Sequence, residues 1–343
     1  MTILLIDAFG MNGGAEKVML NTYNALSKEH KVYCFLPVNS FIKKHIAIED
    51  LVEFHSIFNL VSSVKLLKPD KVILNNKKTL KFLFPIKLFS PKVQIYYHSH
   101  SYFRNSLELA IYSFCFVPFL YSIFCVSKSL KENHTAYLIN NKKHKLLYNG
   151  FNFKISSKTK TKTNKDINIF FWAQFRVWKG HLFLLNVIKK IDNPNIKFHF
   201  VANIQDVESE NLLKKIKLVA KNQGIEKQVI LHLNKENYLD VIQENADIAL
   251  SCSQIQDPLP TIIIESLSMG IPILATNVGG SSEILEKHQT LLSSVNLDEF
   301  SSKLNQLVQN YQKINSNKLK QHFNDYFSLC KYESNILTIF KNK

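Results

Sequence analysis

The sequence predicts an α/β protein with two Rossmann-like domains, each built around a parallel β-sheet. Its 343 residues are too many for one ordinary hydrophobic core. Short apolar runs alternate with longer segments of helical period, which is the pattern of βαβ units. Glycine is scarce at nine residues, and most of these glycines gather in loops after predicted strands, where the backbone needs close approach or unusual dihedral angles.

Apolar runs mark the predicted strands, at residues 2–6, 31–36, 71–74, 93–97, 123–126, 168–172, 196–201, 228–231, 247–251 and 272–275. Helical spacing of apolar residues predicts the helices between them, at residues 15–28, 181–191 and 208–222. A compact helix is expected at 261–269, opened by Pro260 and Thr261. Strands and helices therefore alternate along the whole chain, as in two successive parallel sheets.

The predicted domain boundary lies near residue 153. We expect an amino-terminal domain over residues 1–152 and a carboxy-terminal domain over residues 167–324. Residues 153–166 are polar, rich in lysine and without apolar period, so they predict a surface linker or loop. Residues 325–343 are expected to form a closing helix.

Residues 107–126 are apolar enough to resemble a membrane span. Glu108 lies near one end, and Pro118 interrupts the run. We therefore expect a buried helix, a break at Pro118 and a core strand that ends at Val126, with the next helix beginning at Ser127.

The charge balance favours anionic partners other than nucleic acid. The chain has 43 basic and 27 acidic residues, yet only two of the basic residues are arginine, and base recognition favours arginine. Residues 1–152 hold 19 basic and 9 acidic residues. Residues 77–92 interleave lysine with phenylalanine, which suits either contact with an anionic membrane surface or an ordinary helix with a lysine rim.

The cysteines and the start of the chain indicate the compartment. The five cysteines are scattered and show no CxxC spacing, which favours free thiols in a reducing environment. The first residues, MTILLIDAFG, enter an apolar run without a basic region, so they read as a strand rather than a signal peptide. We expect a cytoplasmic protein, with peripheral contact at the inner face of the membrane left open.

Ligands of parallel sheets bind at the carboxyl ends of the strands, and two loops of the first domain carry suitable residues there. Residues 10–18 (GMNGGAEKV) form a glycine turn that opens a helix, whose first amides can hold an anion. Residues 96–104 contain His98, His100 and Arg104. Histidine can donate to a developing phosphate charge or orient a hydroxyl, and no acidic residue at ligand spacing indicates a metal.

The second domain has two further loops of this kind. Residues 170–181 (FFWAQFRVWKGH) place Arg176 and Lys179 at a glycine turn, which suits either a diphosphate clamp or ordinary surface charges. In residues 246–284, Asp257 and Glu265 are separated by seven residues, with the helix start between them. Phosphates could then lie on the helix amino terminus while the carboxylates accept sugar hydroxyls.

This last loop resembles the E-x7-E signature of the family 4 retaining glycosyltransferases. GGAEKVMLNTYNAL is similar to the opening glycine loop and helix of that family, and VSKSL, LLYNGFN and WKGHLFLL resemble its later segments in the expected order. The resemblance implies the GT-B fold, in which two Rossmann-like domains face each other across a cleft.

The resemblance implies a role for each candidate site residue of the second domain. Glu265 would bind the ribose of a nucleotide-sugar, and Asp257 would hold hydroxyls of the donor sugar. Lys179 would neutralise the diphosphate. Arg176 and the helix-start residues Leu259, Thr261 and Ile262 would complete the donor site.

The resemblance also assigns residues of the first domain. Gly13 and Gly14 would allow close approach of the opposite domain. His100, or in second place His98, would match a histidine near the donor sugar and phosphate, and Arg104 is a further candidate. The closing helix would return to the first domain.

Three departures from the family pattern matter. The first carboxylate of the signature is Asp257, one methylene shorter than glutamate. The family arginine is replaced by Gln174, and Arg176 follows two residues later. Pro258 and Pro260 remove backbone amides where the family often has glycine.

The implied reaction is transfer of a sugar from a nucleotide-diphosphate donor to an acceptor hydroxyl, with retention at the anomeric carbon. The expected acceptor is a cell-surface glycan or a lipid-linked acceptor. No DxD sequence occurs, so no metal or other cofactor is expected. Three alternatives stay open: a sugar phosphorylase or a nucleotide-sugar epimerase of the same fold, and a non-catalytic membrane-associated subunit.

Overall fold

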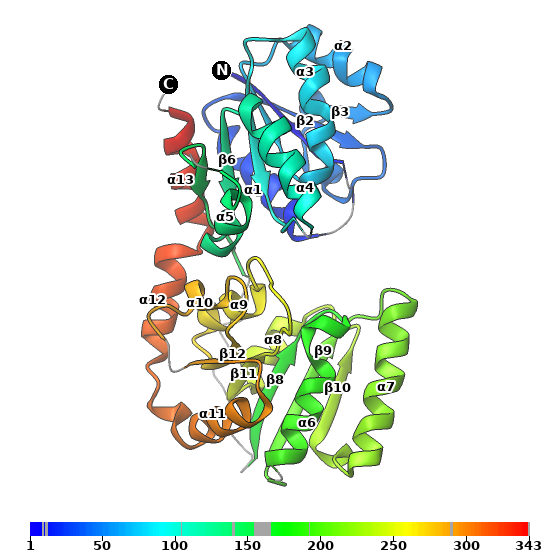
Figure 1. The fold of residues 1–343 in the computed structure, drawn as a ribbon. Helices are drawn as coiled ribbons and strands as arrows, with labels where there is room; N and C mark the ends of the chain where they lie inside the picture. The colour runs from blue at the N-terminus through cyan, green and yellow to red at the C-terminus, as the bar shows by residue number, and fades with distance from the viewer. Residues whose placement is uncertain are drawn as a thin grey trace. The chain divides into compact units, whose positions relative to one another are not determined.

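The computed structural model describes residues 1–8, 10, 13–103, 105–138, 141–153, 166–191, 193–288 and 291–341 (Figure 1). The chain forms two compact units, each described by itself below. Unit 1 combines Met1–Phe151 with Tyr326–Lys343, and unit 2 is Asn152–Asp325. Most of the expected linker at 153–166 lies outside the described residues.

Unit 1 contains a parallel sheet, which in its described residues has the strand order β3-β2-β1-β4-β5-β6-β7. The outward order from β1 in both directions is that of a doubly wound fold. The strands are β1 (Thr2–Ile6), β2 (Lys31–Pro37), β3 (Leu51–Phe54), β4 (Lys71–Leu74), β5 (Gln94–Ser99), β6 (Ser122–Cys125) and β7 (His144–Leu146). Every pairing between these strands is parallel.

Helices cover both faces of this sheet because the central strands are apolar on both sides. Ile3 and Leu5 of β1 pack in one core with residues of the first and last helices of the unit. Leu4 and Ile6 pack in a second core on the other face. The helices and turns are α1 (Gly14–Leu26), η1 (Phe41–His45), η2 (Ile48–Asp50), α2 (Ile57–Leu67), η3 (Lys77–Phe82), α3 (Leu83–Phe89), α4 (Ser106–Ile111), the π-helical turn η4 (Tyr112–Phe116), η5 (Val117–Phe119), α5 (Lys128–Thr135) and α13 (Leu329–Lys341).

The last helix of the chain, α13, packs in the core of unit 1 against α1. The hydroxyl of Tyr332 lies 2.5 Å from that of Thr22, and the ammonium of Lys71 lies 5.0 Å from the ring centre of Phe340. A Cβ at Gly150 would meet the ring carbon Cγ of Tyr332 at 2.9 Å, so only glycine fits there without a shift. Residues far apart in sequence thus complete one core.

Unit 2 contains a second parallel sheet, with the order β10-β9-β8-β11-β12-β13 in its described part. Its strands are β8 (Ile167–Trp172), β9 (Ile196–Ala202), β10 (Val229–Leu233), β11 (Ile248–Ser251), β12 (Ile273–Thr276) and β13 (Leu292–Ser293). Its helices and turns are η6 (Val177–Lys179), α6 (His181–Ile191), α7 (Val207–Gln223), η7 (Glu226–Gln228), α8 (Tyr238–Asn245), α9 (Thr261–Met269), α10 (Ser281–Ile284), α11 (Leu297–Asn310), η9 (Tyr311–Lys313) and α12 (Ser316–Tyr326). Helix α6 lies alongside α7 and α11 (Figure 1).

The α/β class with two Rossmann-like sheets is confirmed, and each predicted strand matches an observed one to within about two residues. The sequence prediction missed β3, β7 and β13. All three lie at sheet edges, where strands are short and lack a continuous apolar run.

The apolar segment 107–126 has the expected order of elements, but its helix is not buried as predicted, because Leu107 is 71% exposed and Phe114 is 68% exposed. Helix α4 passes through η4 to a turn that contains Pro118, and β6 follows. The side chain of Ser127 accepts from the amide of Leu130 at 3.1 Å and so caps α5. Within the described residues, no helix combines the length and the apolar character that a membrane crossing requires.

Candidate functional site

The first group of candidate residues surrounds the amino end of helix α9 in unit 2. The helix begins at Thr261 and ends at Met269, as predicted, and Pro260 is its N-cap residue. Leu259 and Ile262 are buried, whereas Thr261 is exposed. The first amides of a helix have no partner within it, so this end of α9 offers donors to an anion.

Glu265 lies in the second turn of α9, and its side chain is only 6% exposed. Two donors hold its carboxylate. The indole Nε1 of Trp172, at the end of β8, donates to Oε2, and the hydroxyl of Tyr238 donates to Oε1 over 3.3 Å. Burial and the adjacent Glu265 charge raise the pKa of Tyr238, so this hydroxyl keeps its proton.

The prediction missed Trp172 and Tyr238 as partners of Glu265. Trp172 carried a signal, because it is a residue with a polar tip at the carboxyl end of a predicted strand. Tyr238 lies at the start of α8, where no local pattern marked it. Together they orient the carboxylate, since both donate a hydrogen bond to it.

Lys179 and Asp257 come together in the structure, although 78 residues separate them. The ammonium of Lys179 lies 2.6 Å from Oδ2 of Asp257, and the two side chains are 18% and 10% exposed. The same ammonium lies 4.2 Å from the ring centre of Trp178. The strongest candidate cation and the first carboxylate of the signature thus form one partly buried ion pair.

Three glycines bring the loops of this ion pair together. Gly180 adopts φ +85°, and a Cβ there would lie 2.8 Å from the carbonyl carbon of Cys252. Gly279 adopts φ +56°, and its Cβ would lie 2.6 Å from the amide nitrogen of Asp257. The amide of Gly280 donates to the carbonyl of Asp257 at 2.8 Å. The turn before α6 and the turn before α10 therefore fix the backbone on which Lys179 and Asp257 stand.

Arg176 belongs to a different ion cluster. Its guanidinium donates to both carboxylate oxygens of Asp206, at 2.9 and 2.5 Å, and lies 3.5 Å from Glu208. This fork holds the pKa of Asp206 well below its usual range. Gln174 is exposed in the turn after β8, where its carbonyl accepts from the amide of Arg176. The structure thus pairs Arg176 with acidic residues at the start of α7 rather than with the residues around α9.

The second group of candidates lies in unit 1, at the carboxyl ends of β1, β4 and β5. Gly13 is the N-cap residue of α1, and Gly14 is its first residue. A Cβ added at Gly14 would meet no atom within 4 Å, so that position faces open space. Glu16 in the first turn is buried, and burial raises the pKa of its carboxyl.

The two candidate histidines differ in exposure. His98 lies within β5 and is 1% exposed, whereas His100 follows the strand and is partly exposed. Their ring centres are 4.4 Å apart, and Nε2 of His100 lies 3.4 Å from Oδ1 of Asn75. Burial lowers the pKa of His98 and lowers that of His100 to about 3. Both imidazoles are therefore neutral near pH 7, and Arg104 lies outside the described residues.

Three polar residues of this edge were missed by the sequence prediction: Asp7, Asn75 and Asn76. The side-chain amide of Asn76 donates to Asp7, and that of Asn75 donates to the carbonyl of Ala15 at 3.1 Å. All three lie within two residues of the end of a predicted strand, which is the signal that could have found them. No group of three His, Cys, Asp or Glu side chains suited to a metal occurs among the described residues.

Comparison with known proteins identifies the family. A family model described as "Glycosyl transferases group 1" matches residues 152–325, which are the whole of unit 2. The chain belongs to this family. It is 29% identical over 184 residues to the capsular polysaccharide biosynthesis glycosyltransferase CapH of Staphylococcus aureus. That match covers 53% of this chain and 48% of CapH, so the chain aligns with about half of its relative.

Solved structures of this family's fold cover the chain from end to end. Anabaena HepE in complex with UDP has a TM-score of 0.88 at 16% identity, and the match covers 100% of both chains. A glycosyltransferase from Rickettsia africae has a TM-score of 0.85 at 18% identity, covering 99% of this chain and 97% of the other. These likenesses confirm the GT-B fold.

Proposed function

We propose that the protein transfers a sugar from a nucleotide-diphosphate donor to an acceptor hydroxyl, with retention at the anomeric carbon, in the synthesis of a cell-surface polysaccharide or glycolipid. The observation that carries this proposal is the Lys179–Asp257 ion pair beside helix α9, whose second turn holds the buried Glu265. The part of the chain that contains these residues is the part that matches the family.

The donor's ribose is the proposed ligand of Glu265. Trp172 and Tyr238 orient its carboxylate, and a carboxylate accepts hydrogen bonds from sugar hydroxyls. HepE, which has the same fold, has been solved in complex with UDP and with UDP-glucose, which supports a nucleotide-sugar as the donor class.

The diphosphate is the proposed ligand of Lys179 and of the first amides of α9. In this proposal Lys179 exchanges Asp257 for the phosphate oxygens, and Asp257 then accepts hydroxyls of the donor sugar. The bond between the anomeric carbon and the phosphate oxygen breaks, and its electron pair stays on the phosphate. The acceptor oxygen bonds to the same face of the sugar and passes its proton to the departing phosphate. Prearranged donors stabilise this developing charge, so the proposal requires no metal.

The first domain is the proposed acceptor side. Neutral His100 can hydrogen-bond an acceptor hydroxyl, and among the described residues no atom lies within 4 Å of a Cβ position at Gly14. The acceptor class we propose is a glycan or a lipid-linked glycan, at the cytoplasmic face of the membrane.

Thermal stabilisation by a panel of UDP-, GDP- and ADP-sugars tests the donor site. A ligand that binds only the folded state stabilises it by about 2.7 kcal/mol at a hundredfold excess over its dissociation constant. We expect one class of nucleotide-sugar to raise the melting temperature, and we expect Glu265→Ala to abolish that rise. Glu210→Ala, an exposed glutamate on α7, is the matched control. A full rise in Glu265→Ala would refute the ribose assignment.

A further inference from the structure

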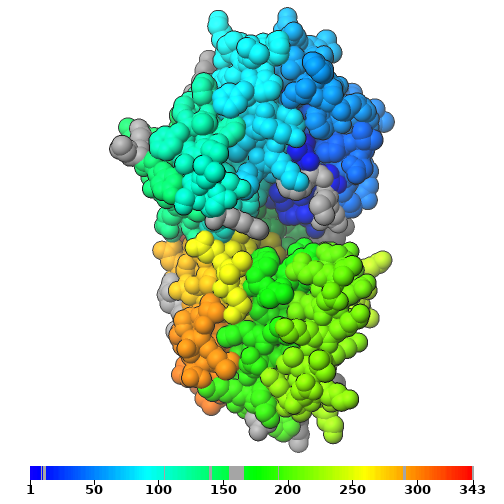
Figure 2. Space-filling view, turned by 45° about the vertical axis from the view of Figure 1, so that its right-hand side comes forward, coloured from blue at the N-terminus to red at the C-terminus, as the bar shows by residue number. Residues whose placement is uncertain are grey.

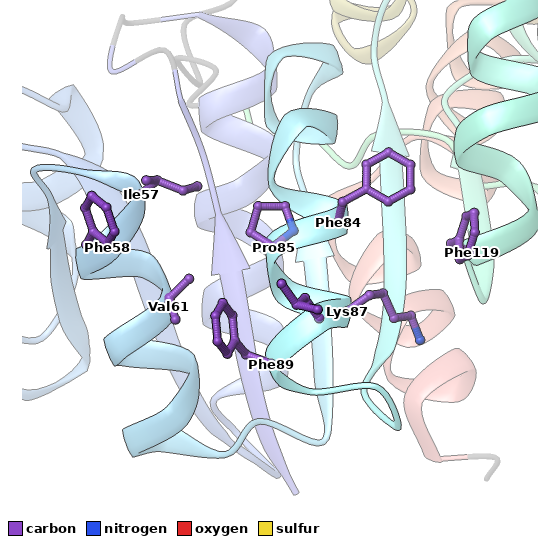
Figure 3. Close-up of a pocket in the computed structure, with 9 residues that line it drawn as sticks. Ile57, Phe58, Val61, Phe84, Pro85, Lys87, Phe89 and Phe119 are labelled. Carbon is purple, nitrogen blue, oxygen red and sulfur yellow. The ribbon is translucent and has the colours of Figure 1, made fainter.

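An apolar groove lies on the surface of unit 1, between helices α2 and α3 (Figure 3). Phe58 and Val61 line it from α2, Leu88 and Phe89 line it from α3, and the groove has a volume of about 700 Å³. On the right-hand side of Figure 3, Phe84 of α3 points toward Phe119 of η5, and their ring centres are 5.5 Å apart. We call this surface the α2–α3 groove.

The side chains of the α2–α3 groove are unusually exposed for their type. Phe58 is 79% exposed and Leu88 is 73% exposed, and Leu66 on the same helix as Phe58 is 82% exposed. Single exposed apolar side chains are normal, but several around one groove mark an interaction surface. Covering them would remove apolar area from water at about 25 cal/mol per Å².

The segment that carries the groove is rich in lysine. Residues 57–92, which run from α2 through α3, contain eight lysines and one acidic residue. Lys71 is buried against Phe340 and Lys77 pairs with Glu108, so these two do not contribute to the surface of the groove. The ammonium of Lys65 lies 4.4 Å from the ring centre of Phe89, so positive charge stands at the rim of the groove. Lys81 is also exposed. The segments coloured blue to cyan in Figure 2, which include this stretch, form much of the visible surface of unit 1.

We propose that the α2–α3 groove docks on the surface of an anionic phospholipid bilayer. Phe58 and Leu88 enter the boundary between headgroups and acyl chains, while the lysines contact the anionic headgroups. A second copy of this chain is the poorer occupant, because a twofold contact would bring the same lysines against each other. The proposal goes beyond sugar transfer and does not depend on it, although such docking would suit a lipid-linked acceptor.

Flotation of the full-length protein with vesicles tests this proposal. The vesicles are phosphatidylcholine alone, or phosphatidylcholine with about 30% phosphatidylglycerol as the anionic component. We expect binding to the anionic vesicles at least about tenfold tighter than to the neutral ones, and weaker binding as salt is added. No preference for anionic vesicles would overturn the proposal.

Matched variants locate the contact. Phe58→Glu combined with Leu88→Glu should reduce vesicle binding by at least about tenfold, because two charges enter the apolar contact. Leu218→Glu, on α7 of unit 2 and 58% exposed in the wild type, should bind normally. Likewise Lys65→Gln with Lys81→Gln should weaken binding, and Lys214→Gln with Lys215→Gln on α7 should not. Equal binding by the groove variants and their controls would overturn the assignment.

Two further measurements separate docking from misfolding and from self-association. A Leu88→Trp variant should show a blue shift of tryptophan emission with anionic vesicles, since the native Trp172 and Trp178 both lie in unit 2. If sedimentation shows a dimer that the Phe58→Glu, Leu88→Glu variant dissociates, the groove binds a second copy and the bilayer proposal fails. Stabilisation by nucleotide-sugar should persist in the groove variants. Its absence in the wild type, together with intact vesicle binding, would refute the proposed function alone.

Discussion

The carboxyl edges of the two sheets have the same architecture but carry different polar groups. In unit 2 this edge carries charged groups, in the ion pair of Lys179 with Asp257 and in the buried carboxylate of Glu265. In unit 1 the edge is lined by His98, His100, side-chain amides and the buried Asp7, and burial keeps both imidazoles neutral. The comparison teaches that the same fold presents different polar groups at its edge, depending on which side chains follow the strands.

This difference follows from the surroundings of the ionisable side chains at each edge. Lys179 and Asp257 form an ion pair of 2.6 Å whose side chains are 18% and 10% exposed. His98 has no such partner carboxylate, and burial therefore favours its neutral form. The edge of unit 2 thus carries a lysine ammonium, whereas the edge of unit 1 combines neutral imidazoles and amides with the buried Asp7.

The largest effect should follow from removal of the Lys179 ammonium in unit 2. We expect Lys179→Ala to reduce turnover by about 10²–10³-fold, as removal of one prearranged donor does, with a smaller loss of donor affinity. The measurement is nucleotide release from the stabilising donor, with extracted membrane glycolipids as acceptor. Arg176→Gln is the control, and because Arg176 pairs with Asp206 at the start of α7 rather than with residues around α9, its turnover should stay within about fivefold of wild type. Equal losses in both variants would contradict the distinction between the two cations.

A smaller effect should come from the glycine that supports Asp257. Gly279→Ala combines a left-handed backbone with a Cβ close to the Asp257 backbone, and we expect it to lower the free energy of unfolding by about 3 kcal/mol. Gly224→Ala is a matched control, because Gly224 has φ +70° but open space around its Cβ position. It should cost only about 1 kcal/mol. Urea denaturation measures both, and equal costs would show that the close approach of the two loops is unimportant.

The smallest effect concerns the neutral histidines of unit 1. The pKa of His100 is lowered to about 3, whereas an unfolded histidine titrates near pH 6.5. The unfolded chain therefore binds more protons between these values, and stability falls as the pH drops from about 6.5 toward 3. His100→Asn should reduce this slope by at most about 1.4 kcal/mol per pH unit.

Urea midpoints between pH 7 and pH 4.5 measure the slope. The wild-type protein, measured over the same pH values, is the reference. An unchanged slope in His100→Asn would mean that this imidazole is not held neutral by the fold.

Much of the fold could be predicted because local sequence patterns determine it. The strand runs and the start of α9 at Thr261 follow from apolar pattern and helix-start residues, and the structure agrees with them. The edge strands β3, β7 and β13 could not be predicted, since pairing with a neighbouring strand defines them rather than their own composition.

The candidate site shows the same division. The sequence placed Glu265 on its helix, but its partner Trp172 is 93 residues away and had to be found in the fold. The contact between Lys179 and Asp257 likewise forms only when the chain adopts its tertiary structure. The sequence also singled out the lysine and phenylalanine residues of 77–92, yet the α2–α3 groove needed the packing of α2 beside them.

The return of the chain to unit 1 affects the order in which the two units can mature on the ribosome. Unit 2 is continuous in sequence, from Asn152 to Asp325, so it can fold as soon as it has emerged. Unit 1 emerges first but lacks the helix that supplies Tyr332, Ile336 and Phe340 to its core. During synthesis, the amino-terminal part of unit 1 therefore keeps an incomplete apolar face until helix α13 has been made. Nascent-chain chaperones would find that face accessible.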